Sequence, residues 1–226
     1  MKTTTCALAL SLGLAVASNA ALSLTNGDFS SDTSNWNSEF GTSPDGWFSS
    51  LASTNTNGNY GEAMTGGGGS NNNFTYGTGR VAALKQVSGN YYQQTIGLVG
   101  EQTGVQVDFL GGYRAHSSYS TAARNISIEV SLWDATLNVE LASTTIDYAY
   151  LAAGNALAAE SKVLTYTSAN GANDLALRFT NVSANPSGAN PNTALIDGVS
   201  ITAVPEPSSA ALLGLGGLAL ILRRRK

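Results

Sequence analysis

Short stretches in which apolar and polar residues alternate dominate the middle of the chain. Alternation with a period of two puts one set of side chains on each face of an extended strand, so it predicts half-buried β-strands. The clearest stretches are "VQVDFL" at 105–110, "NISIEVSLW" at 125–133, "DLALRF" at 174–179 and "LIDGVSI" at 195–201. Further predicted strands cover residues 80–87, 91–96, 138–145 and 161–167.

Segments rich in glycine, serine, asparagine and proline separate these strands, as in "SANPSGANP" at 183–191. We assign no strand within residues 53–79, where such residues predominate. "YAYLAAGNALAAE" at 148–160 leans toward helix, but Gly154-Asn155 interrupts it, so we interpret it as a loop with a helical turn. Many short strands with such spacers predict an all-β fold, an antiparallel β-sandwich.

Apolar runs also lie at both ends of the chain. Residues 1–20 combine Lys2, an apolar run and small residues at the end, the order of a secretory signal peptide cut after Ala20. The run 208–222 would form a helix of roughly 23 Å, a short span for a bilayer core of about 30 Å. Four cations follow it: Arg223, Arg224, Arg225 and Lys226. They predict a short transmembrane helix whose basic end stays in the cytoplasm, with the preceding domain outside.

The triplet Pro205-Glu206-Pro207 stands directly before this apolar run. Its two prolines keep the chain extended and prevent an earlier helix start. The triplet, the glycine-containing apolar run and the arginine cluster together resemble the PEP-CTERM sorting signal of Gram-negative bacteria. The resemblance implies that an exosortase-type membrane enzyme recognises Pro205, Glu206 and Pro207 and cuts near them. The tail 204–226 is then a temporary inner-membrane anchor, and the domain is delivered to the cell surface or the extracellular polymer matrix.

Residues 21–203 have the length of one domain. The whole chain has a net charge of −4, but this part holds six basic residues against fourteen Asp and Glu, which leaves −8. Nucleic-acid binding is therefore disfavoured, because phosphate contacts need clustered Lys and Arg. Cys6, the one cysteine, lies in the predicted signal peptide, so the mature chain has no disulfide and no cysteine metal site.

The predicted domain begins with "NGDF" at 26–29 and closes with "ALIDGVSITA" at 194–203. These two ends resemble jelly-roll domains of the galactose-binding or carbohydrate-binding-module type, although Ser30 stands where such domains often have Glu. Some of those domains hold a structural calcium ion where the first and last strands meet. The resemblance implies that Asp28 and Asp197, helped by the carbonyl of Asn26, are its ligands here. In the alternative, Asp28 bonds its own turn and Asp197 caps a strand end.

Exposed aromatic rings beside polar side chains are candidates for glycan binding, because apolar sugar faces pack against them. The first candidate is the loop "GGYRAHSSYSTAARN" at 111–125, with an ordinary solvent-exposed connection as the alternative. Its candidate residues are Tyr113, Arg114, His116 and Tyr119. "YYQQ" at 91–94 is the second candidate. Trp36, Trp47 and Trp133 are interpreted as core or edge residues of the sandwich.

Catalytic signatures are sparse in this sequence. His116 is the single histidine and the mature chain has no cysteine, which argues against a Cys/His nucleophile and a histidine-rich zinc site. Fourteen acids leave open a carboxylate pair for glycoside hydrolysis, but none lies in a recognisable motif. We predict a non-enzymatic surface or matrix protein that binds polysaccharide or has a structural role, and we assign no catalytic residue. The alternative is an extracellular hydrolase that uses an Asp/Glu pair.

Overall fold

The computed structural model describes residues 22–30, 45–50, 61–65, 80–85, 91–101, 103–113, 126–148, 157–167, 171–183 and 193–204. Within these ranges the chain forms strands and one short 3₁₀ helix, η1 (Val99–Glu101). The strands are β1 (Phe48–Ser49), β2 (Gly61–Thr65), β3 (Arg80–Lys85), β4 (Tyr91–Leu98), β5 (Gly104–Tyr113), β6 (Ile126–Asp134), β7 (Val139–Tyr148), β8 (Ala158–Thr165), β9 (Asp174–Asn181) and β10 (Thr193–Ala203).

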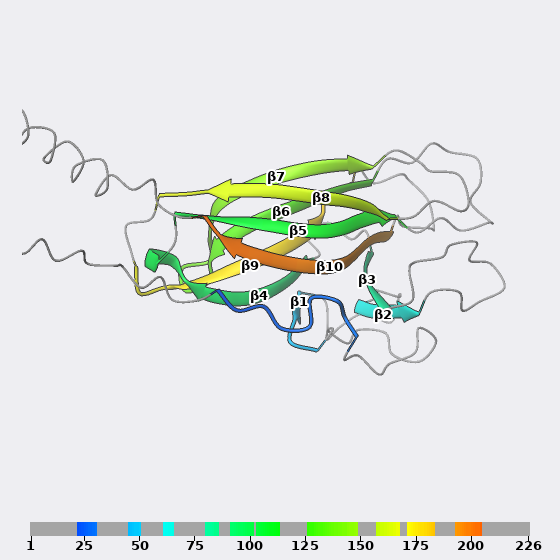
Figure 1. The fold of residues 1–226 in the computed structure, drawn as a ribbon, viewed down its shortest axis with the longest axis horizontal. Helices are drawn as coiled ribbons and strands as arrows, with labels where there is room; N and C mark the ends of the chain where they lie inside the picture. The colour runs from blue at the N-terminus through cyan, green and yellow to red at the C-terminus, as the bar shows by residue number, and fades with distance from the viewer. Residues whose placement is uncertain are drawn as a thin grey trace, which may run out of the picture.

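The strands form two five-stranded antiparallel sheets (Figure 1). Sheet A has the order β1-β4-β9-β6-β7, and sheet B has the order β2-β3-β10-β5-β8. Strands that are distant in sequence are neighbours, since β9 lies between β4 and β6, and β10 lies between β3 and β5. The chain therefore crosses between the sheets repeatedly, as in jelly-roll-like sandwiches. The predicted all-β sandwich is confirmed.

The predicted strands agree with the observed ones to within a few residues. Two observed strands were not predicted. β1 (Phe48–Ser49) is one of them. β2 (Gly61–Thr65) is the other and lies inside residues 53–79, where we assigned no strand. It pairs with β3 from Gly61↔Leu84 to Thr65↔Arg80, at the edge of sheet B. Backbone pairing forms this strand, and the local sequence pattern gave no sign of it. The helix-leaning segment 148–160 supplies the end of β7 and the start of β8, and its middle lies outside the described residues.

The hydrophobic core lies between the two sheets. Alternation in β5 and β6 points one set of side chains inward, and none of them is more than 3% exposed. They are Val105, Val107, Phe109, Ile126, Ile128, Val130 and Leu132. The Phe179 ring meets Phe109 edge-on at 5.2 Å and Trp47 at 6.0 Å. Burial of each such side chain contributes about 1.5–3 kcal/mol. Trp47, which we interpreted as a core or edge residue, is 4% exposed and belongs to the core.

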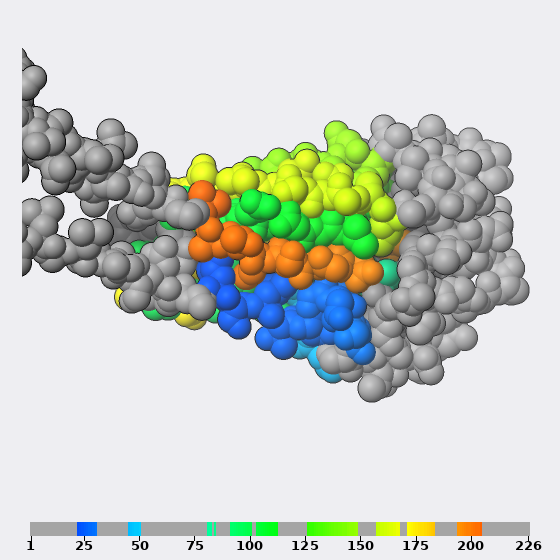
Figure 2. Space-filling model, viewed as in Figure 1, coloured from blue at the N-terminus to red at the C-terminus, as the bar shows by residue number. Residues whose placement is uncertain are grey.

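Residues 22–30 lie along β10 and β4, which brings the first segment beside the last strand (Figure 2). The Ser23 amide donates to the carbonyl of Ile96 at 2.9 Å, and the Val199 amide donates to the carbonyl of Gly27 at 2.8 Å. A Cβ atom at Gly27 would lie 2.1 Å from the Val199 carbonyl oxygen, so this close approach requires glycine. The segment therefore closes one flank of the sandwich.

The opposite flank of sheet B ends at β8, an edge strand. Glu160 and Lys162 pair with Phe109 and Val107 of β5 and lie on the same inward side of the sheet as these buried residues. The two charges form an ion pair at 3.0 Å, with side-chain exposures of 16% and 32%. Charges that point inward at a sheet edge are a known device against pairing with a further strand.

Within the described ranges, no helix has the length and apolar character needed to cross a bilayer. The predicted signal peptide 1–20 and the predicted transmembrane run 208–222 lie outside those ranges. The domain boundaries at 1–20, 21–203 and 204–226 therefore stay predictions.

Candidate functional site

Much of the predicted chemistry falls outside the described residues. Of the first candidate glycan loop, Tyr113 is the last residue of β5, and the other three residues lie outside: Arg114, His116 and Tyr119. The sorting triplet Pro205-Glu206-Pro207 and the four terminal cations also lie outside. The roles assigned to these residues stay predictions.

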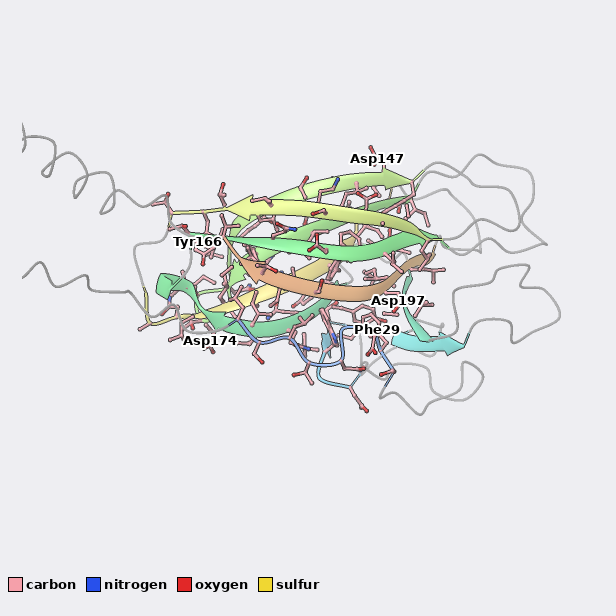
Figure 3. The ribbon with its side chains drawn as sticks, in the orientation of Figure 1. Phe29, Asp147, Tyr166, Asp174 and Asp197 are labelled. Carbon is pink, nitrogen blue, oxygen red and sulfur yellow. The ribbon has the colours of Figure 1, made fainter. Side chains whose placement is uncertain are left out.

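Asp28 and Asp197 come close together where residues 22–30 meet β10; Figure 3 shows Asp197 and the neighbouring Phe29 in this region. Pairing between β10 and β5 shifts register between Asp197 and Ser200, and there the Val199 amide turns to Gly27. Hydrogen bonds from the Ser30 amide and hydroxyl hold the pKa of Asp28 below its usual value. Burial raises the pKa of Asp197, and the negative charge of Asp28 acts in the same direction.

The donor atoms at this place fit a calcium ion only in part. Two adjacent carboxylates repel each other, and a divalent cation would relieve that repulsion. However, the Asn26 carbonyl accepts hydrogen bonds from the Phe29 amide at 3.3 Å and from Trp47 Nε1 at 3.2 Å, which engage both lone pairs. No cluster of three His, Cys, Asp or Glu forms within the described ranges. Calcium binding by Asn26, Asp28 and Asp197 therefore stays a prediction.

The outward face of sheet A carries a different group of residues. Alternation puts Tyr91 and Gln93 of β4 on this face, while Tyr92 and Gln94 point inward and are 1% and 7% exposed. Gln94 holds the N-terminal segment, since its amide nitrogen donates to the carbonyls of Thr25 and Gly46 at 3.0 and 2.8 Å. The second candidate motif "YYQQ" is thus divided between an outer surface and a structural cross-link.

Arg178 of β9 lies at the centre of this outward face, where it pairs with Gln93 on one side and Ser131 on the other. Its guanidinium carbon is 3.8 Å from the centre of the Tyr91 ring and 3.6 Å from that of Trp133. Both faces of the planar cation are therefore covered by aromatic rings, an arrangement that stabilises a buried arginine. The side chain is 6% exposed, and this burial lowers the pKa of Arg178.

Hydrogen bonds fix the edges of the same guanidinium. Nε and Nη2 donate to the Gln93 side-chain oxygen at 2.9 and 2.6 Å, and Nη2 also donates to the Asn138 side-chain oxygen at 3.3 Å. The Trp133 ring is fixed in turn, since its Nε1 donates to the Ser131 hydroxyl at 2.8 Å. Tyr91, Arg178 and Trp133 thus form one rigid unit across β4, β9 and β6.

Phe48 of β1 extends this unit to a fourth strand. Its ring centre lies 6.1 Å from that of Tyr91, and the side chain is 58% exposed. We call Phe48, Tyr91, Arg178 and Trp133 the aromatic row. Neighbouring strands are about 4.8 Å apart, so a row across four strands extends about 14 Å.

Carboxylates lie on the outward faces of β6 and β7, with Glu140 opposite Trp133 and Asp147 toward the other end of the strand pair. Glu129 faces outward on β6, and Glu140 and Asp147 face outward on β7, where they accept hydrogen bonds from Ser143 and Ser127 at 2.6 Å. Figure 3 shows Asp147 near one end of the sandwich. Burial raises the pKa of Glu129, the charge of Glu140 raises it further, and Arg178 opposes both. We call Glu129, Glu140 and Asp147 the acidic rim.

Sequence reasoning missed Arg178 and interpreted Trp133 as a core or edge residue. Trp133 is instead half-buried on the outward face, in contact with the guanidinium. The signal was present in the alternation: Leu177 and Phe179 point into the core, so Arg178 between them must point out. What the alternation does not contain is the strand order that brings β4, β9 and β6 together.

Comparisons with known proteins concern the tail and the sandwich separately. Residues 203–226 match the family described as the PEP-CTERM protein-sorting motif. No curated protein sequence matches the chain significantly. An apo-form cyclase from Fischerella sp. superimposes with a TM-score of 0.55 at 13% identity, covering 82% of this chain and 97% of that one. A cyclase from Fischerella sp. TAU gives 0.53 at 16% identity, covering 82% and 98%.

A solved structure titled "CBM4 structure and function" gives a TM-score of 0.46 at 15% identity, covering 80% of this chain and all of that one. At these identities the structural similarity extends to the β-sandwich fold alone. The motif at the C-terminus is more specific, since it implies export, processing by an exosortase and sorting to the cell surface. The chain is therefore a β-sandwich protein that carries a PEP-CTERM sorting motif at residues 203–226.

Proposed function

We propose that the β-sandwich binds polysaccharide across the outward face of sheet A after the sorting tail has brought it to the cell surface or extracellular matrix. The observation that carries this proposal is the aromatic row, in which Arg178 holds Tyr91 and Trp133 in fixed orientations beside the exposed Phe48. Rings held rigidly in advance lose little conformational entropy when a ligand binds.

The surroundings of the row also suit a glycan. Apolar sugar faces pack on aromatic rings, while hydroxyl groups need donors and acceptors close by. Gln93, Asn138, Ser143 and Glu140 supply such groups on the same face. A row about 14 Å long across the strands matches several sugar units of a chain better than one small molecule.

The tail completes the proposal. Pro205, Glu206 and Pro207 are the recognition element for an exosortase-type enzyme, and residues 208–222 with the basic end hold the chain in the inner membrane of a Gram-negative cell until processing. The matched motif supports the sorting step. The glycan-binding step rests on the aromatic row.

Retention on immobilised polysaccharides tests the binding step. Phe48→Ala should weaken retention about tenfold, equivalent to about 1.4 kcal/mol. Val163→Ala is the matched control, because Val163 on β8 is 57% exposed and Phe48 is 58% exposed, but Val163 lies on sheet B. Retention on no polysaccharide, or equal losses in both variants, would contradict glycan binding and leave a purely structural role.

Hydrolysis of the glycan is the second candidate function, and one observation favours it. Burial and the charge of Glu140 raise the pKa of Glu129, the direction that a general acid needs. Glu140 carries a second carboxylate on the neighbouring strand. The backbone positions of the two residues lie about 13 Å apart along the sheet, at about 3.3 Å per residue, so both side chains would have to reach toward each other to attain the roughly 5–9.5 Å between the carboxyl groups of a glycosidase. Release of reducing sugar that is lost in Glu129→Gln would establish the enzyme; binding without release would favour the binding module.

A further inference from the structure

We infer that the outward face of sheet A selects uncharged glycans and rejects polyuronates. This inference rests on the proposed glycan binding and names the class of ligand. Two observations carry it. Arg178, the cation of this face, is hydrogen-bonded and stacked within the protein, and carboxylates lie on the neighbouring strands β6 and β7.

Arg178 is the single Lys or Arg in the five strands of sheet A. Guanidinium recognises carboxylates best through two parallel hydrogen bonds, and each such geometry uses Nη2 together with Nε or Nη1. Here Nη2 already donates to both Gln93 and Asn138, and the rings of Tyr91 and Trp133 cover the two faces. A ligand carboxylate would have to displace one of these partners from a side chain that is 6% exposed.

The acidic rim acts in the same direction. With Glu129, Glu140, Asp147 and the exposed Asp174 of β9 ionised, these four charges and Arg178 give the outward face of sheet A a net charge of −3. In a water-like dielectric, a ligand carboxylate 4–8 Å from a rim carboxylate loses about two- to sixfold in affinity. A polyuronate presents one such charge on every sugar, whereas a neutral chain of the same shape presents none. Residues 21–203 carry a net charge of −8, which adds repulsion at longer range.

A pair of polymers that differ only in charge tests the selectivity. The full chain in a non-ionic detergent is applied to a soluble β-glucan and a β-galactan, and to each polymer after oxidation of its C6 hydroxyls to carboxylates. We expect the oxidised polymer to bind about tenfold or more weakly at about 0.01 M salt, and the ratio to fall toward one at about 1 M salt, where the Debye length is about 3 Å.

Two variants locate the effect on this face. Glu140→Gln, which lies on the rim, should reduce the ratio of neutral to oxidised affinity by about two- to sixfold. Asp108→Asn is the matched control, because it removes one charge from the outward face of sheet B, where Gln106 and Ser161 contact it. Its ratio should stay that of the wild type.

The outcomes separate the two hypotheses. If neither neutral polymer nor its oxidised form is retained, glycan binding itself fails. If the oxidised form binds as well as the neutral one at low salt, or if both variants change the ratio equally, the selectivity of this face is overturned while glycan binding stands.

Discussion

Replacing Arg178 with methionine removes the guanidinium from between Tyr91 and Trp133 and keeps most of the side-chain length. Each cation–π contact of a buried cation contributes about 0.5–2 kcal/mol. The hydrogen bonds from the charged group to Gln93 contribute about 1.5–3 kcal/mol more. Two effects oppose the loss. Burying methionine carries no cost of removing water from a charged group, and its sulfur contributes about 0.3–1.5 kcal/mol by packing on aromatic rings.

The net expectation is a loss of about 2–4 kcal/mol in the free energy of unfolding, a large part of the 5–15 kcal/mol typical of a domain. For a domain of this length that equals a fall of about 5–15 °C in Tm. Arg178→Lys should recover less than half, because an ammonium group lacks the planar faces and the forked donors.

Urea unfolding of the full chain in detergent, followed by tryptophan fluorescence, measures the loss. A double-mutant cycle with Trp133→Leu should give a coupling of about 0.5–3 kcal/mol. Val163→Ala is the control, since Val163 on β8 is 57% exposed and surface substitutions usually change the free energy of unfolding by less than about 0.5 kcal/mol. The reasoning is refuted if Arg178→Met stays within about 0.5 kcal/mol of the wild type, or if the control loses as much.

Three further predictions concern single residues. Glu129→Gln should raise the free energy of unfolding at pH 7, because burial raises the pKa of the folded carboxyl above its usual 4.5. Urea unfolding below pH 4.5 should show no such gain, and a gain that does not change with pH would contradict this prediction. Gly27→Ala should lower the free energy of unfolding by about 1–3 kcal/mol, since its Cβ would lie 2.1 Å from the Val199 carbonyl oxygen. Gly97→Ala should lower it less in the same urea unfolding experiment, because its Cβ would meet only the flexible side chain of Leu22, at 3.2 Å. If calcium binds at Asp197, EDTA should lower the Tm of the wild type and leave Asp197→Asn unchanged; an unchanged wild type argues against the ion.

Alternation predicted which side of each strand faces the core, and the fold class followed from it. In β6 it puts Ile128 and Val130 inside, so that Glu129 and Trp133 must face outward. The same rule separates Gln93 from Gln94 within one motif. Applied to each residue, the alternation places Gln93, Trp133 and Arg178 on the outward face of sheet A, which the interpretation of "YYQQ" as one motif overlooked.

Strand order lay beyond the sequence pattern. Arg178 bonds to Gln93, a residue 85 positions earlier, because β9 inserts between β4 and β6 after the chain has crossed between the sheets. Such crossings depend on how long connections pack, and no local propensity encodes them. β2 is the complementary case, since its existence depends on β3 offering a free edge.

The charged pair of β8, Glu160 and Lys162, has a consequence for crowding. Molecules displayed densely on one surface meet each other at high local concentration. Unpaired backbone N–H and C=O groups on an edge strand can then pair with the edge of another molecule and extend the sheet from one copy to the next. Pairing at the β8 edge would bury Glu160 and Lys162 further, and the loss of their remaining water makes this pairing unfavourable. Neighbouring copies can therefore lie close together without pairing through the β8 edge of sheet B.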